Sequence, residues 1–101
     1  MAYVLILTTT KPADAAWFSA SNIAVQESTF TNIDTFVHAS TGLKHVAHRN
    51  VNANVKENTY VFDTEADANA FQTALLNNAS FATVAAYYAT AGITQAWTTI
   101  G

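Results

Sequence analysis

The alternation of hydrophobic and polar positions along the chain predicts four β-strands. The first, residues 3–9, is apolar on both alternating faces, because Leu5 and Leu7 point one way and Val4 and Ile6 the other. Further strands are predicted at 43–51, 59–62 and 93–100, with the Asn-rich residues 52–58 as a hairpin connection. A strand that is apolar on both faces is covered on both faces.

Helical periodicity fills the intervals between these strands. We predict a helix over about 12–26, because Thr10 and Pro12 suit a helix start, and further helical structure over 28–40. Thr64-Glu65-Ala66-Asp67 follows the pattern of a capping box and begins a helix with Ala68, Phe71 and Leu75 on one face. Asn77-Asn78 interrupts this helix, Ser80 restarts it, and Gly92 is placed for a left-handed C-cap.

The order β-α-β-β-α-β predicts a single ferredoxin-like domain over residues 1–101. Two right-handed βαβ units give a four-stranded antiparallel sheet with the helices on one face. The other face of the sheet then exposes the second apolar side of the first strand. We therefore expect a homodimer through that open sheet face.

The composition narrows the class of protein. Half of the residues are apolar and only 11% are charged, against about 25% in an average protein. The net charge of −3 and four basic residues argue against nucleic-acid binding. No apolar run reaches the roughly 18 residues of a membrane helix, and the start lacks the features of a secretory signal. We therefore expect a soluble, cytoplasmic protein with no membrane partner.

One segment of the chain holds a concentration of polar residues, formed by His45, His48 and Arg49 together with Lys44 and Lys56. His45 and Arg49 share one face of the predicted strand, while Lys44 and His48 point to the opposite face. One interpretation is that His45 and Arg49 line a pocket under the helices, as acid–base group and anion clamp. The alternative places one pair in solvent at a sheet edge and the other at a dimer contact. The residues leave open which face of 43–51 points under the helices.

The aromatic residues offer a second set of candidates. Trp17, Tyr60 and Trp97 could wall a pocket for an aromatic ligand, or could simply fill the core. No metal site is predicted, because His45 and His48 diverge on a strand and the chain has no cysteine. No cofactor motif is present, since the three glycines are isolated.

The second half of the chain resembles a known superfamily. Lys44 to Arg49, Asn58-Thr59-Tyr60-Val61-Phe62-Asp63, Glu65-Ala66-Asp67-Ala68-Asn69-Ala70-Phe71 and Asn78-Ala79-Ser80-Phe81 resemble the dimeric α+β barrel proteins, over about residues 43–100. That superfamily includes antibiotic-biosynthesis-monooxygenase-like proteins, haem-degrading enzymes and isomerases. The resemblance implies a ferredoxin-like fold and a dimer in which two sheets pack face to face. It carries no active site across, because the first strand has no Asn and no His follows His48.

These observations leave three functions open. The first is a small dimeric protein that binds a small apolar or aromatic molecule between helices and sheet. The second is a cofactor-free monooxygenase-like or isomerase-like enzyme, and the third is a non-catalytic structural dimer. An open cavity between helices and sheet that contains His45 or Arg49 would favour the first two functions, and a filled core would favour the third.

Overall fold

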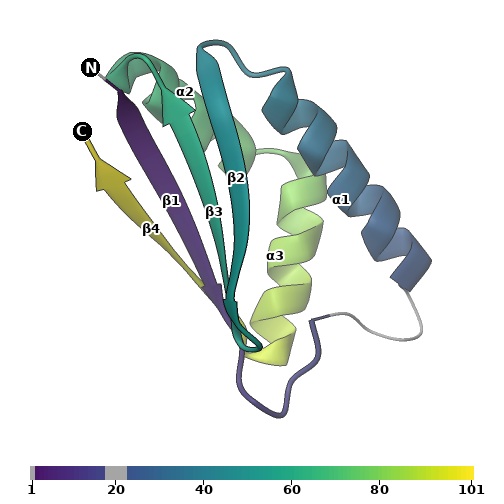
Figure 1. The fold of residues 1–101 in the computed structure, drawn as a ribbon. Helices are drawn as coiled ribbons and strands as arrows, with labels where there is room; N and C mark the ends of the chain where they lie inside the picture. Colours follow the sequence, from purple (N-terminus) through teal and green to yellow (C-terminus); the bar gives the residue numbers. More distant parts are fainter. Residues whose placement is uncertain (1, 18–22) are drawn as a thin grey trace.

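The computed structural model describes residues 2–17 and 23–101, with side chains described for 2–17 and 27–101. The described elements follow in the order β1 Tyr3–Thr10, α1 Ile23–His38, β2 Leu43–Asn52, β3 Val55–Phe62, α2 Glu65–Leu76, α3 Ala79–Ala91 and β4 Thr94–Ile100 (Figure 1). The described strands form one sheet in the order β2-β3-β1-β4, and every neighbouring pair is antiparallel. The predicted ferredoxin-like α+β fold is confirmed.

The described helices cover one face of the sheet and leave the other face open (Figure 1). Leu5 and Phe62 on the covered face are fully buried against Leu75 of α2. Burying each such side chain contributes roughly 1.5–3 kcal/mol to stability. On the open face Val4 is only half-buried and Ile100 is 56% exposed. The covered face therefore holds the core that the monomer can build alone.

Local side-chain hydrogen bonds begin α2 and α3 where the sequence indicates. The Thr64 hydroxyl accepts from the Asp67 amide at 3.1 Å, and the Asn78 carboxamide oxygen accepts from the amides of Ser80 at 3.0 Å and Phe81 at 3.1 Å. Gly92 ends α3 in the left-handed conformation, with φ of 76°. The break between the two helices and the glycine C-cap are both confirmed. No helix among the described residues is long and apolar enough to span a membrane.

The helix predicted over 12–26 is wrong for its first turns. Residues 12–17 are irregular, and α1 runs from Ile23 to His38, so it includes most of the predicted 28–40 segment. Tertiary hydrogen bonds hold the irregular segment: the Trp17 indole donates to the Ala53 carbonyl at 3.1 Å, and the Tyr87 hydroxyl donates to the Ala16 carbonyl at 3.0 Å. The part of the prediction on residues 18–22 lies outside the described residues.

The predicted connection over 52–58 is also corrected. β2 continues to Asn52 and β3 begins at Val55, so that Ala53 and Asn54 alone form the turn. The turn is held by the Asn54 amide, which donates to the Asn52 side-chain oxygen at 2.8 Å. The polar residues around it extend the two strands instead of forming a loop, because they continue the β2–β3 ladder, with Asn52 paired to Val55 and Asn50 to Lys56.

Candidate functional site

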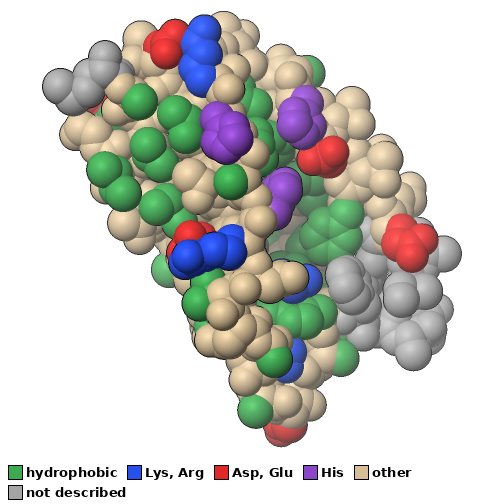
Figure 2. Space-filling model, viewed as in Figure 1, with side chains coloured by type: hydrophobic (Ala, Val, Ile, Leu, Met, Phe, Trp, Pro, Cys, Tyr) green, Lys and Arg blue, Asp and Glu red, His purple; other side chains and the backbone are tan. Residues whose placement is uncertain are grey.

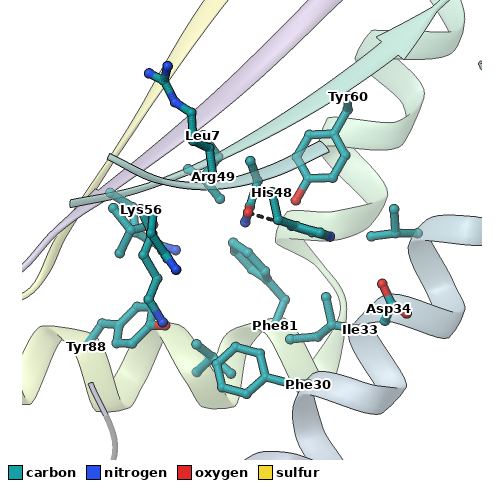
Figure 3. Close-up of a pocket in the computed structure, with 16 residues that line it drawn as sticks. Leu7, Phe30, Ile33, Asp34, His48, Arg49, Lys56, Tyr60, Phe81 and Tyr88 are labelled. Atoms are coloured by element: carbon teal, nitrogen blue, oxygen red, sulfur yellow. Dashed lines mark hydrogen bonds between the residues drawn. The ribbon is translucent and has the colours of Figure 1, made fainter. Parts of the chain in front are cut away.

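A pocket of about 390 Å³ lies between the helices and the covered face of the sheet (Figure 3). Its helical wall comes from Phe30 and Ile33 of α1 and from Phe81, Val84 and Tyr88 of α3. This volume is within the range of small-molecule sites, about 300–1,000 Å³. The core between helices and sheet is therefore not completely filled.

The position of α1 explains why space remains. The C-terminal end of α1 is anchored in the core, where Val37 is buried and the Phe36 ring stacks on Phe71 with centroids 6.2 Å apart. Phe30 and Ile33, in the middle of α1, pack against Val84 and Tyr88 of α3, and the N-terminal end of α1 stands away from the sheet (Figure 1). Figure 2 shows the resulting hollow, between β2 and α1, with histidine side chains gathered around it.

The sheet wall of the pocket is built in rows that cross all four strands. The strand register sets three consecutive rows, spaced two residues apart along each strand. The Tyr60 row consists of Val46, Tyr60, Leu5 and Thr99. The His48–Asn58 row consists of His48, Asn58, Leu7 and Trp97. The Lys56 row consists of Asn50, Lys56, Thr9 and Gln95. Polarity increases from the first row to the third.

The middle row holds the best-defined polar pair of the pocket. The His48 Nδ1 and the Asn58 side-chain oxygen are 2.7 Å apart, across the β2–β3 ladder (Figure 3). Because an amide oxygen only accepts, the imidazole donates from Nδ1. The neutral ring then keeps its lone pair on Nε2, where it can accept a proton. Of the histidines in the described residues, His48 is the one that lines the pocket.

Tyr60 supplies a phenol to the same wall. Burial, at 3% exposure, raises the pKa of Tyr60 to about 12, and the charge of Asp34 adds to the rise, while a hydrogen bond from Asn58 opposes it. The ring is held by Phe71 and Trp97, with centroids 4.9 and 6.3 Å away. At neutral pH the phenol is therefore protonated and available as a hydrogen-bond donor.

The structure places the two polar residues predicted from sequence on the opposite face of β2. His45 pairs with Val61 on the open face, is exposed and does not line the pocket. Arg49 borders the pocket, but its side chain points away (Figure 3) and its Nη2 lies 3.4 Å from the Glu57 carboxylate. A chemical role for either residue stays a prediction. The faces follow from an irregularity between Leu43 and His45, which lets both Leu43 and Val46 pack toward the core.

The three aromatic candidates divide between the pocket and its surroundings. Tyr60 lines the pocket, whereas Trp17 and Trp97 do not. Trp97 packs against the main core, and the Trp17 ring meets Tyr88 edge-on at 6.2 Å. Ligand binding by these residues stays a prediction.

Asn58 is a site residue that the sequence patterns miss, because they place it in the hairpin connection. The spacing of His48 and Asn58 does not reveal the pair, because a regular two-residue hairpin would place His48 opposite Thr59. Only the register shift between Asn50 and Asn52 brings His48 opposite Asn58.

Lys56 belongs to the polar concentration recognised from the sequence, but the same predicted connection gives no direction to its side chain. Lys56 extends into the pocket, where burial lowers its pKa, and its Nζ lies 4.6 Å from the centre of the Trp17 ring. Among the described residues, no three His, Asp or Glu side chains are grouped to hold a metal ion.

Comparison with known proteins shows what the fold resembles. No protein-family model matches the sequence, and no curated protein matches it. Among solved structures, the chain is similar to SnoaB, a cofactor-independent oxygenase from Streptomyces nogalater, with 15% identity, a TM-score of 0.63 and coverage of 99% of this chain and 91% of the other.

Two further structures agree with this likeness. A candidate antibiotic biosynthesis monooxygenase from Deinococcus radiodurans has 11% identity and a TM-score of 0.63, with coverage of 98% and 90%. Another, from Nitrosomonas europaea, has 12% identity and a TM-score of 0.60, with coverage of 99% and 88%. At these identities the comparison shows a shared fold, that of the antibiotic-biosynthesis-monooxygenase-like proteins.

Proposed function

We propose that this chain, which has the fold of the cofactor-independent oxygenase SnoaB, oxidises a small phenolic or enolic aromatic molecule with O₂ and without a cofactor. The observation that carries the proposal is the His48–Asn58 pair in the wall of a mostly apolar pocket. It supplies an oriented base where an acidic hydroxyl group could be enclosed. The open cavity supports this function over that of a purely structural dimer, whose helices and sheet would be in full contact.

The chemistry needs only a base and an enclosed site. The Nε2 of His48 accepts the hydroxyl proton of the substrate, and the resulting phenolate is electron-rich enough to reduce O₂ directly. One oxygen atom bonds to a ring carbon in place of its hydrogen, the O–O bond breaks, and the other atom leaves as water. A phenol and O₂ thus give a quinone and water, and the four electrons lost by the ring balance the four gained by O₂. The Tyr60 hydroxyl donates a hydrogen bond to the developing anion.

The pocket walls support the choice of an aromatic substrate. Phe30, Phe81 and Tyr88 present rings to the cavity, and Ile33 and Val84 complete its apolar side. Such walls can pack against the two faces of a flat apolar ring. Asp34 lies on α1 across the pocket from Lys56 (Figure 3), so the charged side chains stand at its two ends.

Oxygen uptake by the purified, chelator-treated protein with 1-naphthol and other hydroxynaphthalenes tests this function. We expect ¹⁸O from ¹⁸O₂ to enter the product, and we expect the His48→Gln variant to lose about 10²–10⁴-fold in rate. The His45→Gln variant removes the histidine of the open face and should retain the rate. Equal rates for His48→Gln and wild type, or a loss confined to His45→Gln, would show that His48 is not the base.

We further propose that two copies pair through the open sheet face. Val61, Val4 and Ile100 form a continuous apolar row on this face, according to the strand register, and Ile6 lies in the next row. Burying four or five such side chains contributes roughly 6–15 kcal/mol, against an association cost of about 4–15 kcal/mol. The low charge of the chain limits repulsion between the copies.

A further inference from the structure

The Lys56 row concentrates hydrogen-bonding side chains at one end of the pocket. Asn50 is opposite Lys56 on β2, Thr9 is opposite Lys56 on β1, and Gln95 is opposite Thr9 on β4. All four residues line the pocket, although they come from four different strands. No other row on this face of the sheet is polar on every strand. Together they offer an ammonium, a hydroxyl and two carboxamides as donors.

The hydroxyl of Thr9 is a buried donor at this end of the pocket that has no partner among the described residues. The Thr9 side chain is only 5% exposed. Within residues 2–17 and 27–101, no side-chain or backbone group hydrogen-bonds the Thr9 hydroxyl. A buried hydroxyl without a partner costs about 1–3 kcal/mol, so a bound group that accepts its hydrogen bond stabilises the site.

The charge at this end is set by Lys56. Its Nζ lies over the Trp17 ring, and the indole is itself fixed by its hydrogen bond to the Ala53 carbonyl. This contact with the aromatic face is one of those that hold the ammonium beside the cavity. Arg49, the neighbouring cation, is instead directed to Glu57 on the other face of the sheet. Burial disfavours the charged form of Lys56, and a bound anion would offset that penalty.

We infer that the Lys56 row is an anion subsite and that the pocket takes an aromatic acid, with the carboxylate on this row and the reacting hydroxyl at His48. The inference rests on the proposed function and names its substrate class. Successive rows are two residues apart, or about 7 Å along the strands. The carboxylate and the hydroxyl should therefore stand at opposite ends of a single ring, as in a para-hydroxy aromatic acid.

The test compares 4-hydroxybenzoate with its methyl ester by titration calorimetry, since the ester keeps the ring and the hydroxyl but loses the charge. We expect wild type to bind the acid roughly 10- to 100-fold more tightly than the ester, as for a hydrogen-bonded charge. Lys56→Gln should abolish this preference, and Lys56→Arg should retain it. Lys44→Gln is the matched control, because Lys44 bonds to Asp63 at 3.1 Å and does not line the pocket. Circular dichroism checks that each variant is folded.

The alternative outcomes are distinct. Equal binding of acid and ester by wild type, or a preference that survives Lys56→Gln, would overturn the anion subsite and leave the pocket itself intact. Absence of binding by both probes would overturn the assigned substrate class. The oxygen-uptake assay with uncharged hydroxynaphthalenes is independent of Lys56, so a failure of the oxygenase function appears there and a failure of the subsite appears here.

Discussion

The imidazole of His48 and the carboxamide of Asn58 face each other across two antiparallel strands, 2.7 Å apart, and are separated by only ten residues of chain. The two-residue turn at Ala53-Asn54 and the register shift between Asn50 and Asn52 together set this pairing. The orientation of the proposed base is thus a local property of one hairpin. It does not depend on how the helices pack.

Removing the acceptor of Asn58 should lower turnover while binding remains. We expect Asn58→Leu, which has a similar shape and no acceptor, to reduce kcat about 10- to 100-fold with little change in KM, because the imidazole loses its orientation. Asn58→Asp keeps an oxygen acceptor and should retain most of kcat. Steady-state oxygen uptake measures both. Equal kcat values for Asn58→Leu and Asn58→Asp would contradict a positioning role.

The open sheet face should make the protein a dimer. Sedimentation equilibrium at micromolar concentration should give about twice the 10.8 kDa mass of the chain. Val4→Glu places a charge in the middle of the apolar row and should yield the monomer. Leu76→Glu is the control, because Leu76 is 51% exposed on α2, away from this face, and should leave the dimer intact. A monomeric wild type would contradict the proposed pairing.

The two described glycines with positive φ should differ in their tolerance of alanine. Gly42 and Gly92 have φ of 78° and 76°, so alanine costs about 1–2 kcal/mol of backbone strain at either position. At Gly42 the added Cβ would also overlap the Asp67 carboxylate, whereas at Gly92 its nearest neighbour is Pro12 at 3.5 Å. Urea denaturation should show a further loss of roughly 1–3 kcal/mol for Gly42→Ala. Asp67→Ala should restore part of that loss, and equal effects at the two glycines would rule out the overlap.

The buried tyrosines should make the fold sensitive to alkali. Burial raises the pKa of both Tyr60 and Tyr88 to about 12, above the ordinary value of 10. Between pH 10 and 12 the unfolded chain has lost these protons and the native chain holds them, so the free energy of unfolding should fall by roughly 1 kcal/mol per pH unit for each tyrosine. Below pH 10 this contribution is fully present. Denaturation at several pH values should show a shallower fall in Tyr88→Phe, and an unchanged slope would contradict the assignment.

The sequence predicts the fold because its strongest patterns are local. The two-faced strand at Leu5 and Ile6, the Thr64 cap and the Gly92 C-cap each depend on a few adjacent residues, and the structure confirms all three. The site is different, because β2 offers two polar faces. Only the irregularity before His45 turns His48 toward the helices, and alternation alone cannot reveal it. The Asn-rich composition of the hairpin likewise predicts a loop, and the sequence does not reveal that Lys56 and Asn58 lie on strand β3 and face a cavity.

The row arrangement of the pocket has a consequence for how such a site can change over evolution. Each row contains one residue from each of the four strands, and the residues of the next row lie two positions further along each strand. A single substitution at Lys56 or Gln95 therefore alters one end of the cavity while Leu5 and Phe62 keep the core unchanged. Selection can thus exchange the proposed anion subsite for another chemistry one position at a time, with the His48–Asn58 row left in place. A sheet of this kind provides a stable background on which new substrate preferences can arise by short mutational paths.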